Sequence, residues 1–310
     1  MTSTTPTAGR VRTPDRPAVT THRRRRRLSG RRSNLLTLSM LALLIYFLLP
    51  LFWLAVASTK TTADLFSSFG LWFADDVALL SNIRDTFTYD DGVYGRWMLN
   101  TLFYSVVSAT GAAFLCALGG YGFAKYRFRG NGILFGLVLG SIMVPTTALA
   151  IPTYLLFSQV GMVNTPWAII LPSLVSPFGL YLMRIYAQDA IPDSLIEAGR
   201  IDGAGEFQIF FRLALRTLAP GFVTVLLFTL VATWNNYFLP LIMLNNPDLY
   251  PVTVGLASWS SQSVGGGGST GELLALVVTG SMLSVLPLIA AFLLLQRYWQ
   301  SGLSAGGVKG

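Results

Sequence analysis

Six long apolar segments alternate with polar connections along this chain. About 20 apolar residues are enough for a helix to cross a bilayer, because a helix rises about 1.5 Å per residue and the hydrocarbon layer is about 30 Å thick. Each segment meets that length, so the pattern predicts an all-α integral membrane protein with six transmembrane helices. The predicted spans are residues 35–58, 99–123, 133–157, 166–186, 218–244 and 273–295.

Two of the predicted spans contain pairs of prolines. Pro145 and Pro152 lie in the third span, and Pro172 and Pro177 lie in the fourth. Membrane helices tolerate such prolines where neighbouring groups satisfy the freed carbonyls. The prolines indicate either kinks around a transport pathway or ordinary packing kinks, and both interpretations stay open.

Composition supports a membrane protein. With 53% hydrophobic residues, 12% charged residues and a mean hydropathy of +0.57, the 310-residue chain is too apolar for an ordinary soluble domain. The net charge of +8 could suggest nucleic-acid binding, but ten of the 22 Lys and Arg are arginines within residues 1–34. A disordered Arg-rich tail that directs topology and touches anionic lipid explains this better, so we expect no nucleic-acid partner.

The distribution of basic residues predicts the orientation. In a six-span arrangement, 19 of the 22 Lys and Arg lie on the side of the N-terminal tail, and only Lys60, Arg84 and Arg96 lie on the other. By the positive-inside rule, both termini are then cytoplasmic. The expected organisation is a tail at 1–34, a membrane domain at 35–300 and a C-terminal tail at 301–310. Residues 35–58 favour a retained anchor over a cleaved signal peptide, because the run is longer than a usual signal sequence.

Several kinds of chemistry are disfavoured by composition. The chain has one cysteine, Cys116, and one histidine, His22, so catalytic triads and the usual zinc sites are close to excluded. None of the three lysines follows a glycine-rich phosphate loop. We therefore expect no catalytic residue, no metal and no cofactor bound by this chain. All 14 acidic residues lie outside the predicted spans, which indicates a pathway for a neutral polar solute rather than for ions.

A polar segment at 191–220 interrupts the apolar pattern and organises the rest of the chain. Pro192 and a Ser194–Glu197 capping box predict the start of a short helix, and Gly203 and Gly205 mark its end. Acidic and basic side chains nearly balance within it. Such a segment is either a solvated loop between membrane helices or a docking element for another protein.

Residues 197–204 read Glu-Ala-Gly-Arg-Ile-Asp-Gly-Ala and are followed by an apolar run. This resembles the EAA loop of the permease subunits of binding-protein-dependent ABC importers, although Gly199 replaces a usual alanine and Arg216 stands where a Leu-Pro pair often ends the motif. The resemblance implies a cytoplasmic coupling helix, within residues 187–216, that sits in a cleft of an ATP-binding subunit. The residues it assigns to coupling are Glu197, Ala198, Gly199, Asp202, Gly203 and Ala204.

Residues 233–240 form the most distinctive sequence within a predicted span. Aromatic faces beside amides are suited to sugars, which stack through C–H faces and hydrogen-bond through hydroxyls. The segment also resembles the fifth helix of sugar-importing members of the same family. The alternative is that the amides join helices as structural hydrogen bonds. The pathway candidates are Trp234, Asn235, Asn236 and Tyr237.

The last residues resemble the ending of the smaller, MalG-type permease of maltose-type importers, and a frayed tail is the alternative. The resemblance implies that Val308, Lys309 and Gly310 contact the ATPase. It also implies that Trp259, in a loop at 245–272 that is predicted to be flexible at its glycine run, faces the binding protein.

Taken with these motifs, the resemblance implies the MetI/MalG-like six-helix bundle of a sugar importer in the bacterial inner membrane. Its implied partners are a second homologous permease, two ATP-binding subunits that carry ATP and magnesium, and an extracytoplasmic sugar-binding protein. The implied mechanism is alternating access, driven by closure of the ATPase. Two other classes stay open at this point: a secondary transporter of a neutral polar solute, and a membrane enzyme that would use the acidic residues Asp75, Asp76, Asp90 and Asp91.

Overall fold

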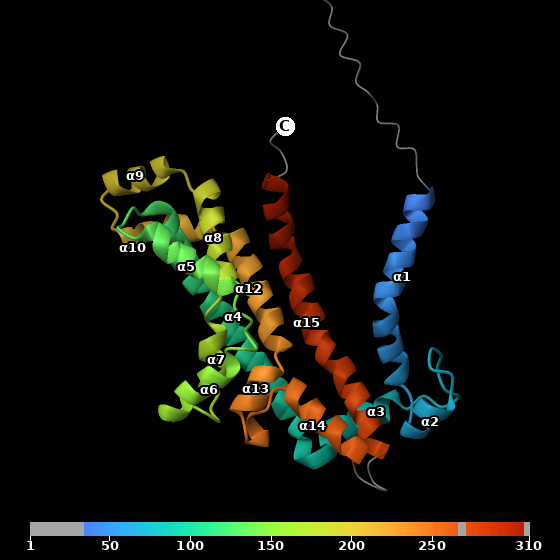
Figure 1. Ribbon diagram of the computed structural model, residues 1–310. Helices are drawn as coiled ribbons and strands as arrows, with labels where there is room; N and C mark the ends of the chain where they lie inside the picture. The colour runs from blue at the N-terminus through green and yellow to red at the C-terminus, as the bar shows by residue number, and fades with distance from the viewer. Residues whose placement is uncertain (1–33, 266–270, 307–310) are drawn as a thin grey trace, which may run out of the picture. The chain divides into compact units, whose positions relative to one another are not determined.

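The computed structural model describes residues 34–265 and 271–306, and these residues form helices, turns and loops without a β-strand (Figure 1). The chain divides into a small unit that ends at Phe47 and a large unit that begins at Leu48. In the small unit, residues 34–47 form the first part of α1 (Asn34–Ala57). The remaining elements belong to the large unit.

Helices of very different lengths make up the large unit. Two are long: α4 (Val93–Lys125) and α15 (Gly271–Gly306). The others are α2 (Thr62–Ser67), α3 (Leu79–Thr88), α5 (Asn131–Ile142), α6 (Ala150–Gln159), α7 (Trp167–Ser173), α8 (Pro177–Ala190), α9 (Asp193–Ile201), α10 (Glu206–Ile209), α11 (Leu215–Thr217), α12 (Ala219–Trp234), α13 (Phe238–Met243) and α14 (Val252–Gly265), with short turns η1 (Tyr89–Gly92), η2 (Phe210–Ala214) and η3 (Pro247–Leu249).

Helix α4 is the centre of the bundle and packs most extensively against α8 and α12. Small residues let the backbones approach closely. A Cβ placed on Gly120 of α4 would lie 2.6 Å from Cβ and 2.7 Å from the carbonyl carbon of Met183 on α8, which is less than atoms tolerate. A glycine is therefore required where these two helices cross.

A second contact joins α4 to α14 through aromatic rings. Trp259 of α14 lies 4.9 Å from Trp97 and 6.2 Å from Tyr94, centroid to centroid, and only 2% of Trp259 is exposed. The expectation that Trp259 faces a binding protein is therefore wrong for this conformation, because the ring of Trp259 is buried in the core. The loop expected at 245–272 is also largely a helix, α14, while residues 266–270 lie outside the described residues.

Three of the predicted continuous spans are broken. The third is two short helices, α5 and α6, separated by turns at 143–149 that include Pro145. Proline lacks an N–H and disfavours helical backbone in the residue before it, which explains the break. The fourth is divided into α7 and α8, and the fifth ends at Trp234 before a short helix, α13, begins. The connection expected at 60–97, in contrast, contains α2, α3 and η1.

By length and composition, four helical stretches of the described chain can cross a membrane: Asn34–Ala57, Leu79–Lys125, Trp167–Ala190 and Leu273–Gln296. A fifth forms if Glu206–Thr217 and Ala219–Trp234, which are bent by 77°, count as one span. The all-helical membrane fold is confirmed. The count of six spans is not confirmed, because α5 and α6 are each too short.

Candidate coupling surface and pathway segment

The candidate coupling helix, α9, follows α8 after a two-residue turn. Pro192 has an extended backbone (φ −65°, ψ 140°) and is the residue before the first helical residue, Asp193. No side chain caps this end. The predicted capping box of Ser194 and Glu197 is therefore wrong, because the helix begins one residue before Ser194 and leaves Glu197 free to face outward.

The other end of α9 is closed by Gly203. Its φ of +79° lies in the left-handed region that favours glycine. The N–H of Ala204 donates to the carbonyl of Gly199, and the N–H of Gly203 donates to the carbonyl of Arg200, each at 3.0 Å. These two bonds form a Schellman motif, so the predicted stop at Gly203 is confirmed.

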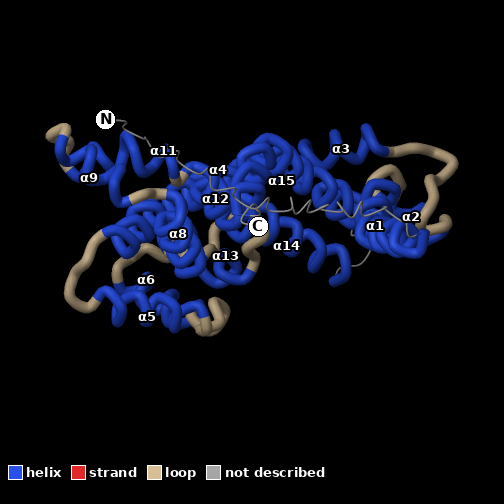
Figure 2. The backbone as a smooth tube through the Cα atoms, turned by 90° about the horizontal axis from the view of Figure 1, so that it is seen from above, coloured by secondary structure: helices blue, strands red, loops and turns tan. Residues whose placement is uncertain are grey.

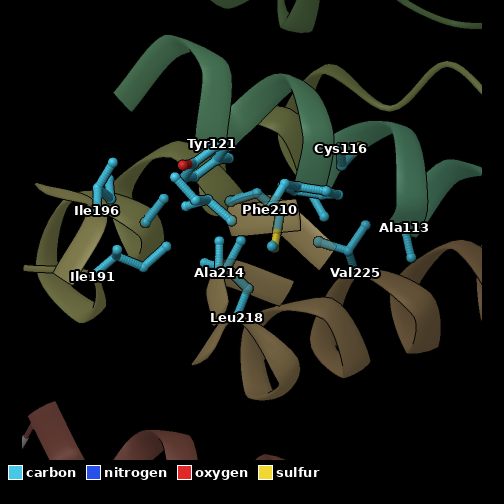
Figure 3. Close-up of a cluster of buried hydrophobic side chains, with 13 residues drawn as sticks. Ala113, Cys116, Tyr121, Ile191, Ile196, Phe210, Ala214, Leu218 and Val225 are labelled. Carbon is cyan, nitrogen blue, oxygen red and sulfur yellow. The ribbon is translucent and has the colours of Figure 1, made fainter. Parts of the chain in front are cut away.

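One face of α9 is anchored in a hydrophobic core. Ile196 is buried, and it shares a cluster with Ile191 and with Phe210 and Ala214 of the following segment (Figure 3). A Cβ on Gly199 would lie 3.1 Å from Cγ1 of Ile209. Glycine at this position lets α9 lie close to Ile209, which gives a structural reason for the departure from the usual alanine.

The opposite face of α9 is open. Glu197, Ala198, Asp202 and Gly203 are exposed, Ala204 is half-buried and Gly199 is buried. Of the six residues assigned to coupling, Gly199 and Ala204 thus lie on the packed side, and the other four lie at the surface. The structure brings all six into one helix and its terminal turn.

Two large apolar side chains on this surface were not singled out from the sequence. Ile201 is 86% exposed and Phe207 is 78% exposed, on either side of the Gly203 turn. Apolar anchors of this kind are typical of the centre of protein interfaces. The helical period could have identified Ile201, because it lies off the stripe of Ile196 and Gly199. Nothing in the apolar run from Phe207 onward distinguishes Phe207 from its buried neighbours.

One ion pair ties this surface to α4, and another joins α9 to α10. Lys125 Nζ, at the end of α4, donates to Asp193 Oδ1 at 2.8 Å, and Arg200 Nε donates to Glu206 Oε1 at 2.8 Å. The hydroxyl of Tyr126 donates to the other oxygen of Glu206. The hydrogen bond from Lys125 lowers the pKa of Asp193, and the hydrogen bonds from Arg200 and Tyr126 lower the pKa of Glu206.

Short connections on both sides of α9 can couple its displacement to the membrane helices. Displacing α9 moves α8 directly, since only Ile191 and Pro192 join them. On the other side, α10 leads through a π-helical turn, η2, into α11 and α12 across the 77° bend. Figure 1 shows α9 and α10 at one end of the bundle, and α3 and α14 at the opposite end.

The pathway candidates lie where α12 ends. Trp234 is 5% exposed, and its indole N–H donates to the carbonyl of Ser284 on α15 at 3.2 Å. The side chain of Asn235 donates to the carbonyl of Val231 at 2.9 Å, within its own helix. Asn236 is half-buried, and its carbonyl accepts a bond from the Thr253 hydroxyl. These hydrogen bonds stabilise the chain where the fifth span breaks. Of the four candidates, Asn235 and Tyr237 are exposed.

An apolar cavity of about 520 Å³ lies between α12 and α15. Its lining includes Leu227, Phe228, Val231 and Leu288, and Thr224 is its only polar residue. A cavity with so few hydrogen-bonding groups does not suit a sugar. Helix α12 lies beside α15, as Figure 2 shows from above.

Val308, Lys309 and Gly310 lie outside the described residues, and α15 is described as far as Gly306, at the same end of the bundle as α9 (Figure 1). Within residues 34–265 and 271–306, no three His, Cys, Asp or Glu side chains gather as a metal site.

Comparisons with known proteins agree on one family. Residues 105–304 match the model of the family described as "Binding-protein-dependent transport system inner membrane component". The chain is 33% identical over 276 residues to the arabinooligosaccharides transport system permease protein AraQ of Bacillus subtilis, covering 89% of this chain and 95% of that protein. It is 30% identical to the lactose transport system permease protein LacG of Rhizobium radiobacter, covering 88% of this chain and 94% of that protein.

A solved structure has the same fold. The fold resembles that of a chain from a bacterial ABC transporter involved in the import of the acidic polysaccharide alginate, with a TM-score of 0.72 and 21% sequence identity. The likeness covers 86% of this chain and 95% of the other.

Proposed function

Because this chain belongs to the family of binding-protein-dependent transport system inner membrane components, we propose that it is a permease subunit of a sugar importer. At the level of the family, it is a multi-pass inner-membrane permease that works with an ATPase and a binding protein, and the ATPase is a separate subunit. The sugar assignment is supported by the substrates in the names of its relatives, arabinooligosaccharides and lactose. The proposed substrate is a disaccharide or an oligosaccharide.

The proposed assembly contains a second, homologous permease, two ATP-binding subunits and an extracytoplasmic sugar-binding protein. ATP and magnesium bind to the ATP-binding subunits, and this chain holds no cofactor. The absence of a glycine-rich phosphate loop from the sequence supports this division of labour.

The proposed topology has both termini and α9 in the cytoplasm. The strong excess of Lys and Arg on that side supports it. In this arrangement the break between α5 and α6 lies within the membrane domain, where neighbouring helices can satisfy the freed backbone groups.

In the proposed mechanism, α9 is the coupling helix and the membrane helices alternate in access. The geometry of α9 supports this coupling role. One face is anchored by Ile196 and Gly199, and the other presents Glu197 and Asp202 to solvent. Closure of the ATPase moves α9 and with it α8 and α12. ATP then biases the equilibrium between the two states of the pathway because the ATPase binds them with different affinity.

The test is transport by the purified assembly. The tagged chain is purified from its native membrane, its partners are identified by mass spectrometry, and the complex is reconstituted into liposomes loaded with ATP. We expect uptake of labelled oligosaccharides that requires both ATP and the binding protein. Uptake by this chain alone, without an ATPase, would contradict the proposal.

A further inference from the structure

A short loop after α1 carries four exposed aromatic side chains. Phe66, at the end of α2, is 78% exposed, and Phe69 and Trp72 in the loop that follows are 73% and 64% exposed. Phe73 is also exposed. So many exposed rings within eight residues need a partner, because large apolar surfaces are costly to keep in water.

This loop folds back beside the apolar helix that precedes it. The Cβ position of Gly70 lies 3.9 Å from Nε1 of Trp53, on α1. Trp53 lies four residues before the end of α1 at Ala57, which corresponds to about 6 Å along the helix axis. The backbone of the loop therefore returns to the depth of the last turns of α1.

Hydrogen bonds hold the loop in this position. Lys60 is only 1% exposed, and its ammonium group donates to the carbonyl of Phe69 at 2.7 Å. The amide of Asn82 donates to the carbonyls of Ser58 and Lys60, each at 2.9 Å. The far end is held by the N–H of Ala78, which donates to the carbonyl of Thr59 at 2.8 Å. The rings are thus exposed on a fixed loop rather than on a loose one.

We propose that residues 66–73 form an interfacial anchor, whose aromatic rings sit in the headgroup region of the phospholipid leaflet that the end of α1 reaches. The loop continues an exposed apolar surface of α1. Leu51, Phe52 and Trp53 leave an exposed apolar face on the last turns of α1, and the loop lies beside Trp53.

The composition of the loop fits the same location. Trp and Tyr are enriched at the membrane–water interface, and Phe is found with Trp on the apolar face of interfacial segments. The exposed carboxylates Asp75 and Asp76 follow directly after the aromatic run and mark the point where the chain returns to water. The role given to Lys60 is to hold the loop at this depth through Phe69.

The depth of the loop can be measured with a spin label. The only cysteine, Cys116, is buried, so Cys116→Ala gives a background for single labelling sites. A nitroxide is placed at Trp72→Cys in the full chain with its co-purifying subunits, in nanodiscs of phosphatidylethanolamine and phosphatidylglycerol. Asp76→Cys is the matched control in the same loop, and Leu44→Cys on α1 is the reference for an apolar helix surface.

The readout is collision of the label with oxygen, which concentrates in lipid, compared with a nickel chelate, which stays in water. We expect a several-fold higher oxygen-to-nickel ratio at position 72 than at position 76. Equal ratios at the two positions would place the loop in water and overturn the proposal. A label at 72 that is immobilised and shielded from both reagents would show that a protein covers the loop, which also overturns it.

Lys60→Met tests how the loop is held. This variant removes the donor to Phe69 and keeps an apolar chain of similar length. The oxygen-to-nickel ratio at position 72 should fall toward that at position 76. An unchanged ratio would overturn the role given to Lys60. None of these readouts depends on sugar transport, so failure of the importer proposal would be recognised separately.

Discussion

Arg200 donates a hydrogen bond to Glu206 at 2.8 Å, which ties the last turn of α9 to the first turn of α10 across Gly203. The pair lies next to the exposed apolar side chains Ile201 and Phe207. The candidate coupling surface therefore includes a corner between α9 and α10. A left-handed glycine turn and an ion pair fix the angle between these two short helices.

Replacing Gly203 should loosen this corner. An L-residue in the left-handed region costs about 1–2 kcal/mol, so Gly203→Ala should lower the melting temperature and weaken retention of the ATPase. Gly205→Ala is the matched control, because Gly205 has a φ of −70° and open space around its Cβ position. Equal effects of the two variants would contradict the role given to the Gly203 turn.

Acid should weaken the same corner. The pKa of Glu206 is lowered in the folded chain, so the unfolded chain binds more protons in the acidic range. The stabilisation of the folded chain by Glu206 is fully present above the ordinary carboxylate pKa of about 4.3. It is lost as pH falls through the lowered pKa of the folded chain. Glu206→Gln should therefore flatten the decrease of the melting temperature with acid. Glu197→Gln, which removes an equal charge but no ion pair of the described residues, is the control for the loss of charge alone.

Crowding at the crossing of α4 and α8 should be costly. Gly120→Ala places a Cβ 2.6–2.7 Å from the backbone and Cβ of Met183, so the helices must separate, at a cost of about 1–3 kcal/mol. Gly122→Ala, two residues along the same helix, meets nothing within 4 Å and should be tolerated. Thermal unfolding of the two variants in detergent compares them, and equal melting temperatures would contradict the packing described for α4.

Two conservative changes in the pathway segment should separate structure from transport. Trp234→Phe removes the donor to Ser284, so it should lower stability by about 0.5–1.5 kcal/mol. Tyr237→Phe removes a hydroxyl from an exposed ring, and it should reduce sugar uptake without changing the melting temperature. A loss of stability in Tyr237→Phe with unchanged uptake would argue against a pathway role for Tyr237.

Much of the fold follows from the sequence because hydrophobic length alone distinguishes membrane helices. That signal does not report where a span breaks, since Pro145 and Pro172 lie in equally apolar surroundings and only Pro145 lies in a long interruption. The hydrophobic length of a segment also does not report which side chains are buried. Trp259 occupies a loop by composition, yet its ring fills the space between Tyr94 and Trp97.

The sequence predicted where the candidate coupling helix ends, but not which of its side chains are packed and which are exposed. Gly203 could be identified because few residues other than glycine close a helix in the left-handed region. The start of α9 was misplaced, since Ser194 and Glu197 have the spacing of a capping box wherever the helix begins. The pairing of Lys125 with Asp193 depends on α4 ending beside α9, which no local pattern contains.

In the proposed assembly, the exposed face of α9 binds the ATPase. Co-purification with Glu197→Lys tests this contact, because the change reverses a charge on that face and the Glu197 side chain makes no hydrogen bond within the described residues. Asp189→Lys makes the same change at an exposed residue on α8, before the coupling helix. We expect an ATP-binding subunit to co-purify with the wild-type chain and with Asp189→Lys, and to be lost from Glu197→Lys while the second permease is retained. Recovery of the ATPase at wild-type levels with Glu197→Lys would contradict the proposed contact.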